Sequence, residues 1–279
     1  MPLEKNNGND GSMSFWEHLD VLRTAIIKIV AVTLICGIVA FVFKESLFRI
    51  VLAPKYDDFV TYRWLFQLSE LLGADITGSR FNVELISTGL AQQFVIHVKT
   101  ALCFGAICAS PYIIYQLFLF IAPALYDVER HYATRVVGAG YLMFLLGMAV
   151  CYFLIFPLTF RFLGTYQVST DVANMITLES YISTLFTMSL SMGIVFEIPV
   201  MSWLLAKLGI INSAILAKYR KHAVVAILIV AAIITPTSDI FTLLVVALPM
   251  YLLYEFSIVI VRCRSLTSCS PLHRERGAR

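Results

Sequence analysis

The chain has 279 residues, of which 59% are hydrophobic and only 14% are charged, and its mean hydropathy is +0.82. Soluble domains carry nearer a quarter charged residues, so the composition excludes an ordinary soluble protein and places the excess apolar residues in membrane spans. The net charge of +3 is too small to indicate a nucleic-acid partner, and we expect none. The six cysteines and five histidines show no metal-ligand spacing, so we expect neither a metal site nor a cofactor.

The N-terminal segment, residues 1–23, is polar and ends in the amphipathic stretch SFWEHLDVLR at 14–23. It contains no apolar run of the signal-peptide type, so we expect the first span itself to direct insertion. In a helix, its aromatic and leucine side chains share one face, while Glu17, Asp20 and Arg23 lie towards another. Taken alone, the segment has the pattern of a helix anchored at the membrane interface.

Six apolar stretches follow this segment. A helix needs about 20 apolar residues to cross about 30 Å of hydrocarbon. The sequence predicts spans at about 24–43, 100–122, 136–160, 181–206, 223–236 and 240–261. The turn sequence TPTSD separates the last two, because Pro with Ser and Asp favours a turn. The fifth span is short, so it requires local bilayer thinning or association with other helices, unless the last two form a re-entrant pair.

The distribution of positive charge predicts the orientation of the spans. With both termini in the cytoplasm, the cytoplasmic segments hold thirteen Lys and Arg residues and the external loops hold six. The positive-inside rule favours this orientation. We therefore predict an all-α integral membrane protein with a membrane domain at 24–261, external loops at 44–94 and 161–180, and a cytoplasmic tail at 262–279. A short helix is expected in the first loop, at WLFQLSELL.

Glu197 is the clearest anomaly within the predicted spans. It lies deep in the fourth span, where an ionisable group is costly and is expected to face protein or water. Pro199 should kink the helix there. Glu197 is therefore either a polar contact for a partner helix, a proton site, or a protonated structural carboxyl bonded within the protein. For Glu255 the favoured interpretation is a hydrogen-bonded structural carboxylate, and for Asp239 it is a helix cap.

The loop APALYDVERHY, at 122–132, carries Glu129 on the predicted cytoplasmic face. Its carboxylate could bind arginines of a basic peptide through charge-assisted hydrogen bonds. The simpler alternative is an acid in the first turn of a helix, where the helix dipole favours negative charge. No paired catalytic groups occur in the chain, so we do not expect an enzyme.

Several stretches together resemble the TatC family, the multi-span subunit of the twin-arginine (Sec-independent) protein translocase. The matching stretches are HLDVLR at 18–23, LAP at 52–54, SPYIIYQLFLFIAPALYDVER at 110–130, FEIPV at 196–200, KYRKHA at 218–223 and TPTSDIFTLLVVALPMYLLYE at 235–255. The resemblance implies six helices with both termini in the cytoplasm, a concave shape, and two short final helices. It also implies a location in the bacterial cytoplasmic membrane.

The resemblance further implies a signal-peptide receptor that exports folded cargo using the proton-motive force. Its expected partners are twin-arginine signal peptides and single-span proteins of the TatA or TatB type, assembled with it in several copies. Matched positions suggest Glu129 and Phe120 for the signal peptide and Glu197 and Thr235 for partner helices. Pro54 and Asp239 match outer-loop positions. The alternative function, a proton-coupled secondary transporter using Glu197, predicts an internal repeat, and none is visible.

One position departs from the family pattern. The first family motif usually reads HLxELR, and its Glu is a second carboxylate for the signal peptide. In this chain that position is Val21. Asp20 is adjacent but about 100° away around a helix, and Glu17 is one turn back on the face of Val21. We hypothesise that Glu17 or Asp20, in the segment closed by Arg23, supplies the missing charge beside Glu129.

Overall fold

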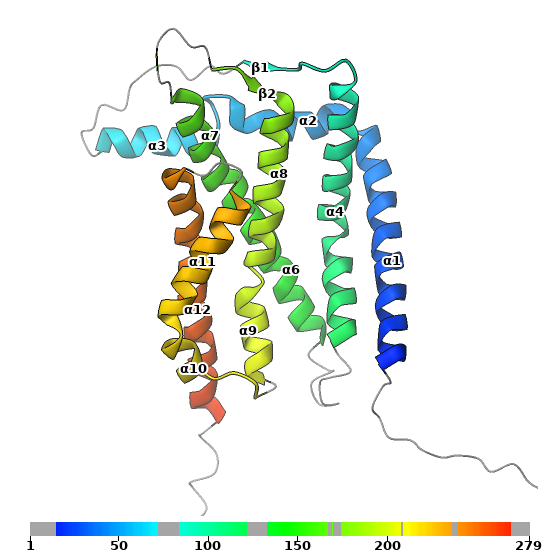
Figure 1. Cartoon of the computed structure of the whole chain (residues 1–279), viewed down its shortest axis with the longest axis vertical. Helices are drawn as coiled ribbons and strands as arrows, with labels where there is room; N and C mark the ends of the chain where they lie inside the picture. Colours follow the sequence, from blue (N-terminus) through cyan, green and yellow to red (C-terminus); the bar gives the residue numbers. More distant parts are fainter. Residues whose placement is uncertain are drawn as a thin grey trace, which may run out of the picture.

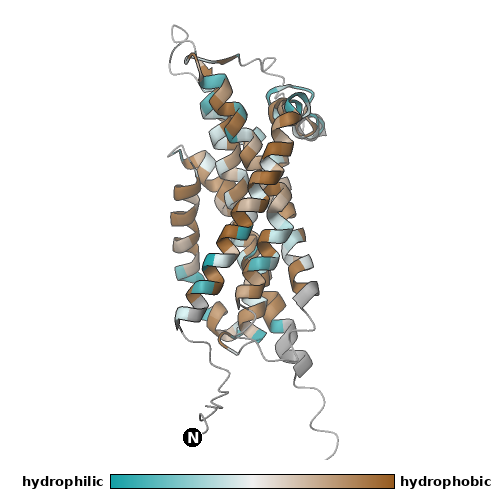
Figure 2. Ribbon diagram, turned by 90° about the vertical axis from the view of Figure 1, so that its right-hand side faces the viewer, coloured by the Kyte–Doolittle hydropathy of each residue, from teal (hydrophilic) through white to brown (hydrophobic). Residues whose placement is uncertain are grey.

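A computed structural model shows an elongated bundle of long helices with short elements across one end (Figure 1). It describes residues 15–71, 84–121, 133–166, 169, 174–207, 209–235 and 239–268. We call the end where α1 begins the N-terminal end of the bundle, and the opposite end, where α2 and α3 lie, the loop end. Figure 2 shows hydrophobic residues along most of the length of the long helices, as expected of helices in contact with lipid.

Five stretches of the described chain are long and apolar enough to cross a membrane. They are Leu19–Val42, Gln92–Phe120, Val136–Thr165, Leu178–Lys207 and Ile240–Arg262. The predicted fifth span corresponds to α11, Arg220–Ile234, whose 15 residues extend over about 22 Å and fall short of a full bilayer core. The fold is therefore helical, as predicted, with one crossing shorter than the others.

Helix α1, Phe15–Val42, lies at one edge of the bundle and packs along α4, Gln92–Ile121 (Figure 1). The two backbones touch where a glycine of each helix faces the other. A Cβ atom placed on Gly105 would lie only 2.6 Å from the backbone nitrogen of Gly37. Close approach of this kind is typical of small residues in membrane helix pairs, since lipid provides no hydrophobic drive for helix association.

The third crossing consists of α6, Ala133–Val150, the π-helical segment η3, Cys151–Ile155, and α7, Phe156–Thr165. Pro157 explains the change of winding, because its ring cannot donate to the carbonyl four residues earlier and would collide with it. That carbonyl belongs to Phe153, and it accepts a hydrogen bond from the Thr61 hydroxyl of α3. A residue of α3 thus takes the hydrogen bond that the proline cannot make.

The fourth crossing is divided into α8, Leu178–Val195, and α9, Ile198–Lys207. The helix is interrupted at Phe196 and Glu197, directly before Pro199, so the predicted kink is confirmed. The next elements are α10, Ser213–Lys218, α11, and α12, Ile240–Ser268, which runs antiparallel to α11 (Figure 1). The expectation of two short final helices holds for α11 but not for α12, which has 29 residues.

The described part of the first long loop, which the sequence predicts to be external, contains more secondary structure than expected. It contains α2, Lys44–Leu52, the 3₁₀ turn η1, Ala53–Lys55, and α3, Val60–Leu71, which confirms the short helix predicted there. Strand β1, Leu85–Ile86, pairs in parallel with β2, Ile176–Thr177, and so joins the two loops that the sequence predicts to be external. Neither α2 nor this two-stranded pair was predicted.

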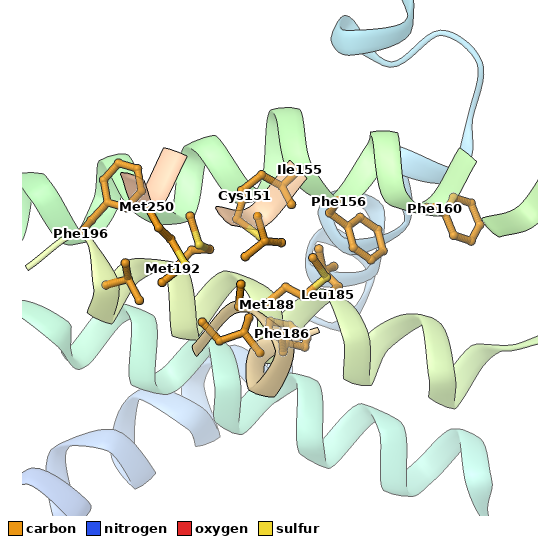
Figure 3. Packing of buried hydrophobic residues seen from close by; sticks show 14 of the residues in the cluster. Cys151, Ile155, Phe156, Phe160, Leu185, Phe186, Met188, Met192, Phe196 and Met250 are labelled. Atoms are coloured by element: carbon orange, nitrogen blue, oxygen red, sulfur yellow. The ribbon is translucent and has the colours of Figure 1, made fainter. Parts of the chain in front are cut away.

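The best-packed part of the core lies between the third and fourth crossings and α12. Buried side chains from η3, α7, α8 and α12 meet there (Figure 3), among them Cys151, Phe156, Met188, Met192 and Met250. This core fixes the third and fourth crossings to each other, whereas α1 is attached to the bundle mainly through α4.

Candidate functional site

A pocket of about 450 Å³ lies between α1 and α4 at the N-terminal end of the bundle. It is lined by Asp20, Val21, Thr24, Ala25 and Lys28 of α1 and by Gln116, Leu119 and Phe120 of α4. Asp20 and Phe120, which are 100 positions apart in the chain, therefore line one pocket. Both were predicted from the sequence as signal-peptide-binding residues.

The α1–α4 pocket contains charges of both signs. Asp20 is exposed, and among the described residues its carboxylate has no hydrogen-bond or ion-pair partner. Lys28 lies eight residues further along α1, about 12 Å deeper along the helix axis. On the facing helix, the side-chain amide of Gln116 donates to the Tyr112 hydroxyl at 2.7 Å. The lining of the pocket thus includes an exposed carboxylate, that of Asp20, and an aromatic ring, that of Phe120.

The other predicted residues of this group are placed less completely. Position 21, where the family has an acid, lines the pocket as Val21, next to Asp20. Arg23 is exposed on α1 and is not among the lining residues. Glu17 belongs to α1, but its side chain lies outside the described part, and so does the whole of Glu129. The structure therefore brings together Asp20 and Phe120, and it leaves the positions of the Glu17 and Glu129 carboxylates undescribed.

Glu197 lies at a second pocket, of about 500 Å³, formed between α4, α6, α8 and α9. Its Oε1 atom is buried and has no hydrogen-bond partner among the described residues. A Cβ atom on Gly140 of α6 would lie 3.0 Å from Glu197 Oε2, so the missing side chain at position 140 leaves room for the carboxyl. Apart from Glu197 and Ser110, the lining is apolar. The arrangement leaves a carboxyl oxygen able to accept a hydrogen bond from a partner.

Thr235 and Asp239 lie at the turn between α11 and α12 and do not reach the Glu197 pocket. The buried Thr235 hydroxyl donates to the carbonyl of Ala231 at 3.0 Å, within the last turn of α11. The Asp239 carboxylate accepts from the backbone N–H of Thr242 at 2.7 Å and so caps α12. Both side chains therefore stabilise helix ends around this turn.

Pro54 is buried in η1 at the loop end of the bundle. The Tyr62 hydroxyl lies 3.1 Å from the carbonyl of Pro54 and 3.1 Å from that of Pro157 on α7, so its one proton is shared between them. Burial raises the pKa of Tyr62 above its ordinary value, and the nearby Arg161 guanidinium opposes that shift. The hydroxyl therefore remains a donor near neutral pH and ties η1 and α3 to the third crossing.

Two further tyrosines hold the end of α2, and sequence reasoning missed them. The Tyr152 hydroxyl donates to the carbonyl of Ile50 at 2.6 Å, and the Tyr181 hydroxyl donates to that of Val51 at 3.0 Å. These carbonyls belong to the last turn of α2, where helices leave acceptors unpaired. For Tyr181 a signal was available, because it stands at the start of the predicted span 181–206, where amphipathic rings gather. Tyr152 lies well inside its span and gave no such signal.

Glu255 is not a free acid within the membrane. Its carboxylate accepts from Arg220 at 2.8 Å and from the Tyr251 hydroxyl at 3.1 Å, which confirms the hydrogen-bonded structural interpretation. Glu255 is therefore not available as a second deep acid for the alternative function, a proton-coupled transporter using Glu197. Within the described ranges, no three His, Cys, Asp or Glu side chains come together in a way that could hold a metal ion.

Comparison with known proteins identifies the family. Residues 17–249 match the family model of the Sec-independent protein translocase protein (TatC). The TatC protein of Blattabacterium sp. subsp. Periplaneta americana is 37% identical over 260 residues, which cover 92% of this chain and 97% of that protein. The TatC protein of Deinococcus radiodurans is 33% identical over 268 residues, covering 96% and 92%.

A solved structure agrees with these relatives. The crystal structure of the twin-arginine translocase receptor TatC superposes with a TM-score of 0.71 at 32% identity, covering 89% of this chain and 100% of that one. Sequence and fold therefore agree over nearly the whole chain. The protein belongs to the TatC family and is a membrane-embedded subunit of the twin-arginine, Sec-independent protein translocase rather than an enzyme.

Proposed function

We propose that the α1–α4 pocket binds the arginine pair of twin-arginine signal peptides on the cytoplasmic face of the bacterial inner membrane. The observation that carries this proposal is the meeting of Asp20 and Phe120 in one pocket. A carboxylate accepts charge-assisted hydrogen bonds from a guanidinium group, and an aromatic face attracts its planar cation. The same two side chains would discriminate arginine from lysine, because lysine lacks the planar fork.

Asp20 is the better candidate for the acid that is missing at Val21. Both positions line the pocket, so a carboxylate at 20 faces the same space as one at 21. Glu129 is the proposed second acid, and it follows the end of α4 by eight positions in the chain. Glu17 remains the alternative to Asp20, since it also lies in the first turns of α1.

The rest of the proposed function concerns orientation and partners. Both termini are assigned to the cytoplasm by the charge distribution. The carboxyl oxygen of Glu197 that lacks a partner among the described residues supports the Glu197 pocket as a contact for a single-span partner of the TatA or TatB type. Thr235, at the end of α11, marks a second region proposed to contact such partners. Several copies of the chain and its partners would form the path for folded cargo, driven by the proton-motive force.

A crosslinking experiment tests the peptide site. A photo-crosslinking residue at Leu119, which lines the pocket, should capture a twin-arginine signal peptide in membrane vesicles that contain the full-length protein. The matched control is Leu142, exposed on α6 and not among the lining residues. A twin-lysine peptide should give little product at 119. Equal capture at 119 and 142, or equal capture of both peptides, would contradict the proposal.

Charge neutralisation tests which acid acts. Asp20→Asn should weaken peptide binding about tenfold or more, because a hydrogen bond to a charged group is worth about 1.5–3 kcal/mol. Glu17→Gln should have the smaller effect if Asp20 is the substitute. Export of a twin-arginine cargo is measured for both single variants and for the double variant. If all three export normally, neither acid replaces the one missing at Val21.

A further inference from the structure

A third pocket, a groove near the N-terminal end of the bundle, has no role in the proposed peptide site. It has a volume of about 500 Å³ and lies between α6, α9 and α12. It is lined by Val136, Ala139, Met143, Pro199, Val200, Trp203, Phe256 and Ile260, which are all apolar or aromatic. Because the three helices belong to membrane spans, a groove of this kind opens on lipid and not on water.

On two of the three helices, α9 and α12, the residues that line the groove are followed along the same helix face by a basic residue. On α9 the row continues from Trp203 to Lys207, and the Lys207 ammonium lies 5.0 Å from the centre of the Trp203 ring. On α12 the row through Phe256 and Ile260 continues, four residues on, to position 264, which is Arg in the sequence. Both helices run toward the N-terminal end of the bundle (Figure 1), so both rows lead to a basic position toward that end.

The size of the groove limits what can fill it. An α-helix about 10 Å in diameter occupies about 1,250 Å³ over three turns, more than twice the volume of this groove. An extended hydrocarbon chain is much thinner and can follow the groove along its length. The order of residues along the groove matches the order of groups in a phospholipid. The apolar lining suits an acyl chain, the Trp203 ring suits the membrane interface, and the basic positions that follow suit a phosphate.

We propose that this groove is a binding site for an anionic phospholipid. One acyl chain lies between α6, α9 and α12, and the phosphate lies beside Lys207 and the end of α12. A net negative headgroup is preferred over a zwitterionic one because cationic residues near a membrane surface attract anionic lipid. The proposal requires only that the N-terminal end of the bundle meets a headgroup layer, so it does not depend on the peptide site or on the orientation of the chain.

Tryptophan fluorescence tests the site directly, because the chain contains only three tryptophans. Trp16→Phe and Trp64→Phe together leave Trp203 as the single reporter inside the groove. The full-length variant is placed in phosphatidylcholine bilayers that contain a small fraction of lipid with brominated acyl chains, which quench tryptophan on contact. Brominated phosphatidylglycerol should quench Trp203 at about one fifth of the concentration that brominated phosphatidylcholine needs, since one cation near the surface contributes about a fivefold preference.

Two controls separate a specific site from general contact with lipid. Lys207→Gln should reduce the preference for phosphatidylglycerol, whereas Lys44→Gln, at the other end of the bundle, should leave it unchanged. A variant that keeps only Trp64, on α3, should show no headgroup preference. Equal quenching of Trp203 by both brominated lipids would overturn the proposal, and so would the absence of quenching by either, because the groove would then be covered by protein.

Discussion

The contact between α1 and α4 predicts that a single methyl group at Gly105 will disturb the protein. A Cβ atom there would lie 2.6 Å from the nitrogen of Gly37 and 2.7 Å from the carbonyl oxygen of Thr33. Ordinary contacts of carbon begin near 3.5 Å, so α1 would have to move by about 1 Å. The opposing atoms belong to the backbone and cannot turn aside as a side chain could.

The expected cost follows from two opposing effects. Overpacking of a tight contact costs about 1–3 kcal/mol, and a clash with backbone places Gly105→Ala near the upper limit. Alanine in a helix is favoured over glycine by about 1 kcal/mol, which offsets part of this cost. We therefore expect Gly105→Ala to lower the free energy of unfolding by about 2 kcal/mol. Gly37→Ala should be nearly neutral, because the nearest atom to its Cβ is the flexible end of Leu102, at 3.3 Å, and the backbone atoms nearby are at an ordinary 3.6 Å.

Unfolding by titration with a denaturing detergent measures this difference. The matched control is Gly138→Ala on α6, where a Cβ meets nothing within 4 Å and only the gain in helix propensity remains. Because α1 carries Asp20, its displacement should also reduce crosslinking of a twin-arginine peptide in the α1–α4 pocket. If Gly105→Ala is as stable as Gly138→Ala, the close approach of α1 and α4 is wrong.

Three further predictions concern other contacts. Asp239→Ala should lower stability by about 1 kcal/mol, the value of a helix N-cap, and an unchanged melting temperature would contradict this role. Tyr62→Phe should cost about 1–3 kcal/mol because two buried proline carbonyls, one of them that of Pro54, lose their shared donor. Limited proteolysis should then cleave the segment that contains η1 and α3 faster than in the parent protein. Glu197→Ala should impair assembly with a single-span partner on native gels more than it impairs peptide crosslinking, and unchanged complexes would count against a partner contact.

The membrane helices could be predicted because lipid imposes a simple requirement on the sequence. A backbone in hydrocarbon must satisfy its own hydrogen bonds, so apolar runs of sufficient length become helices. Hydropathy marks where the hydrocarbon ends, however, and not where a helix ends. This explains α12, which continues to Ser268 beyond the apolar limit near Val261 because Arg, Leu and Ser are all compatible with a helix.

Helix α2 and the β1–β2 pair could not be predicted, unlike α3, because distant residues hold them. The end of α2 is bound by Tyr152, about 100 positions further along the chain, and β1 pairs with a strand from the other external loop. No local pattern contains such contacts. The π-helical segment has a local cause, Pro157, but a proline in a span predicts only a disturbance. Which local structure results depends on Thr61, whose hydroxyl donates to the Phe153 carbonyl that Pro157 leaves without a backbone donor.

The residues of the proposed peptide site could be named from the sequence, but the geometry of the α1–α4 pocket could not. Asp20 and Phe120 were both identified, yet the angle of about 100° between positions 20 and 21 suggested that Asp20 would face away from the space assigned to the family acid. That argument treats α1 as an isolated helix. A pocket between two helices covers a wide arc of each surface, so adjacent positions can line it together, as Asp20 and Val21 do.

The FEIPV stretch combines several local effects to place one carboxyl in the membrane. Pro199 cannot donate to the carbonyl four residues earlier, so the fourth crossing breaks at Phe196 and Glu197. The break directs Glu197 toward α6, where Gly140 leaves the space that a larger residue would fill. A carboxyl inside a regular helix could be shielded by its neighbours, but here Oε1 is buried without a partner among the described residues. Such a group is costly in lipid unless something donates to it, which is the physical reason to expect a partner at this pocket.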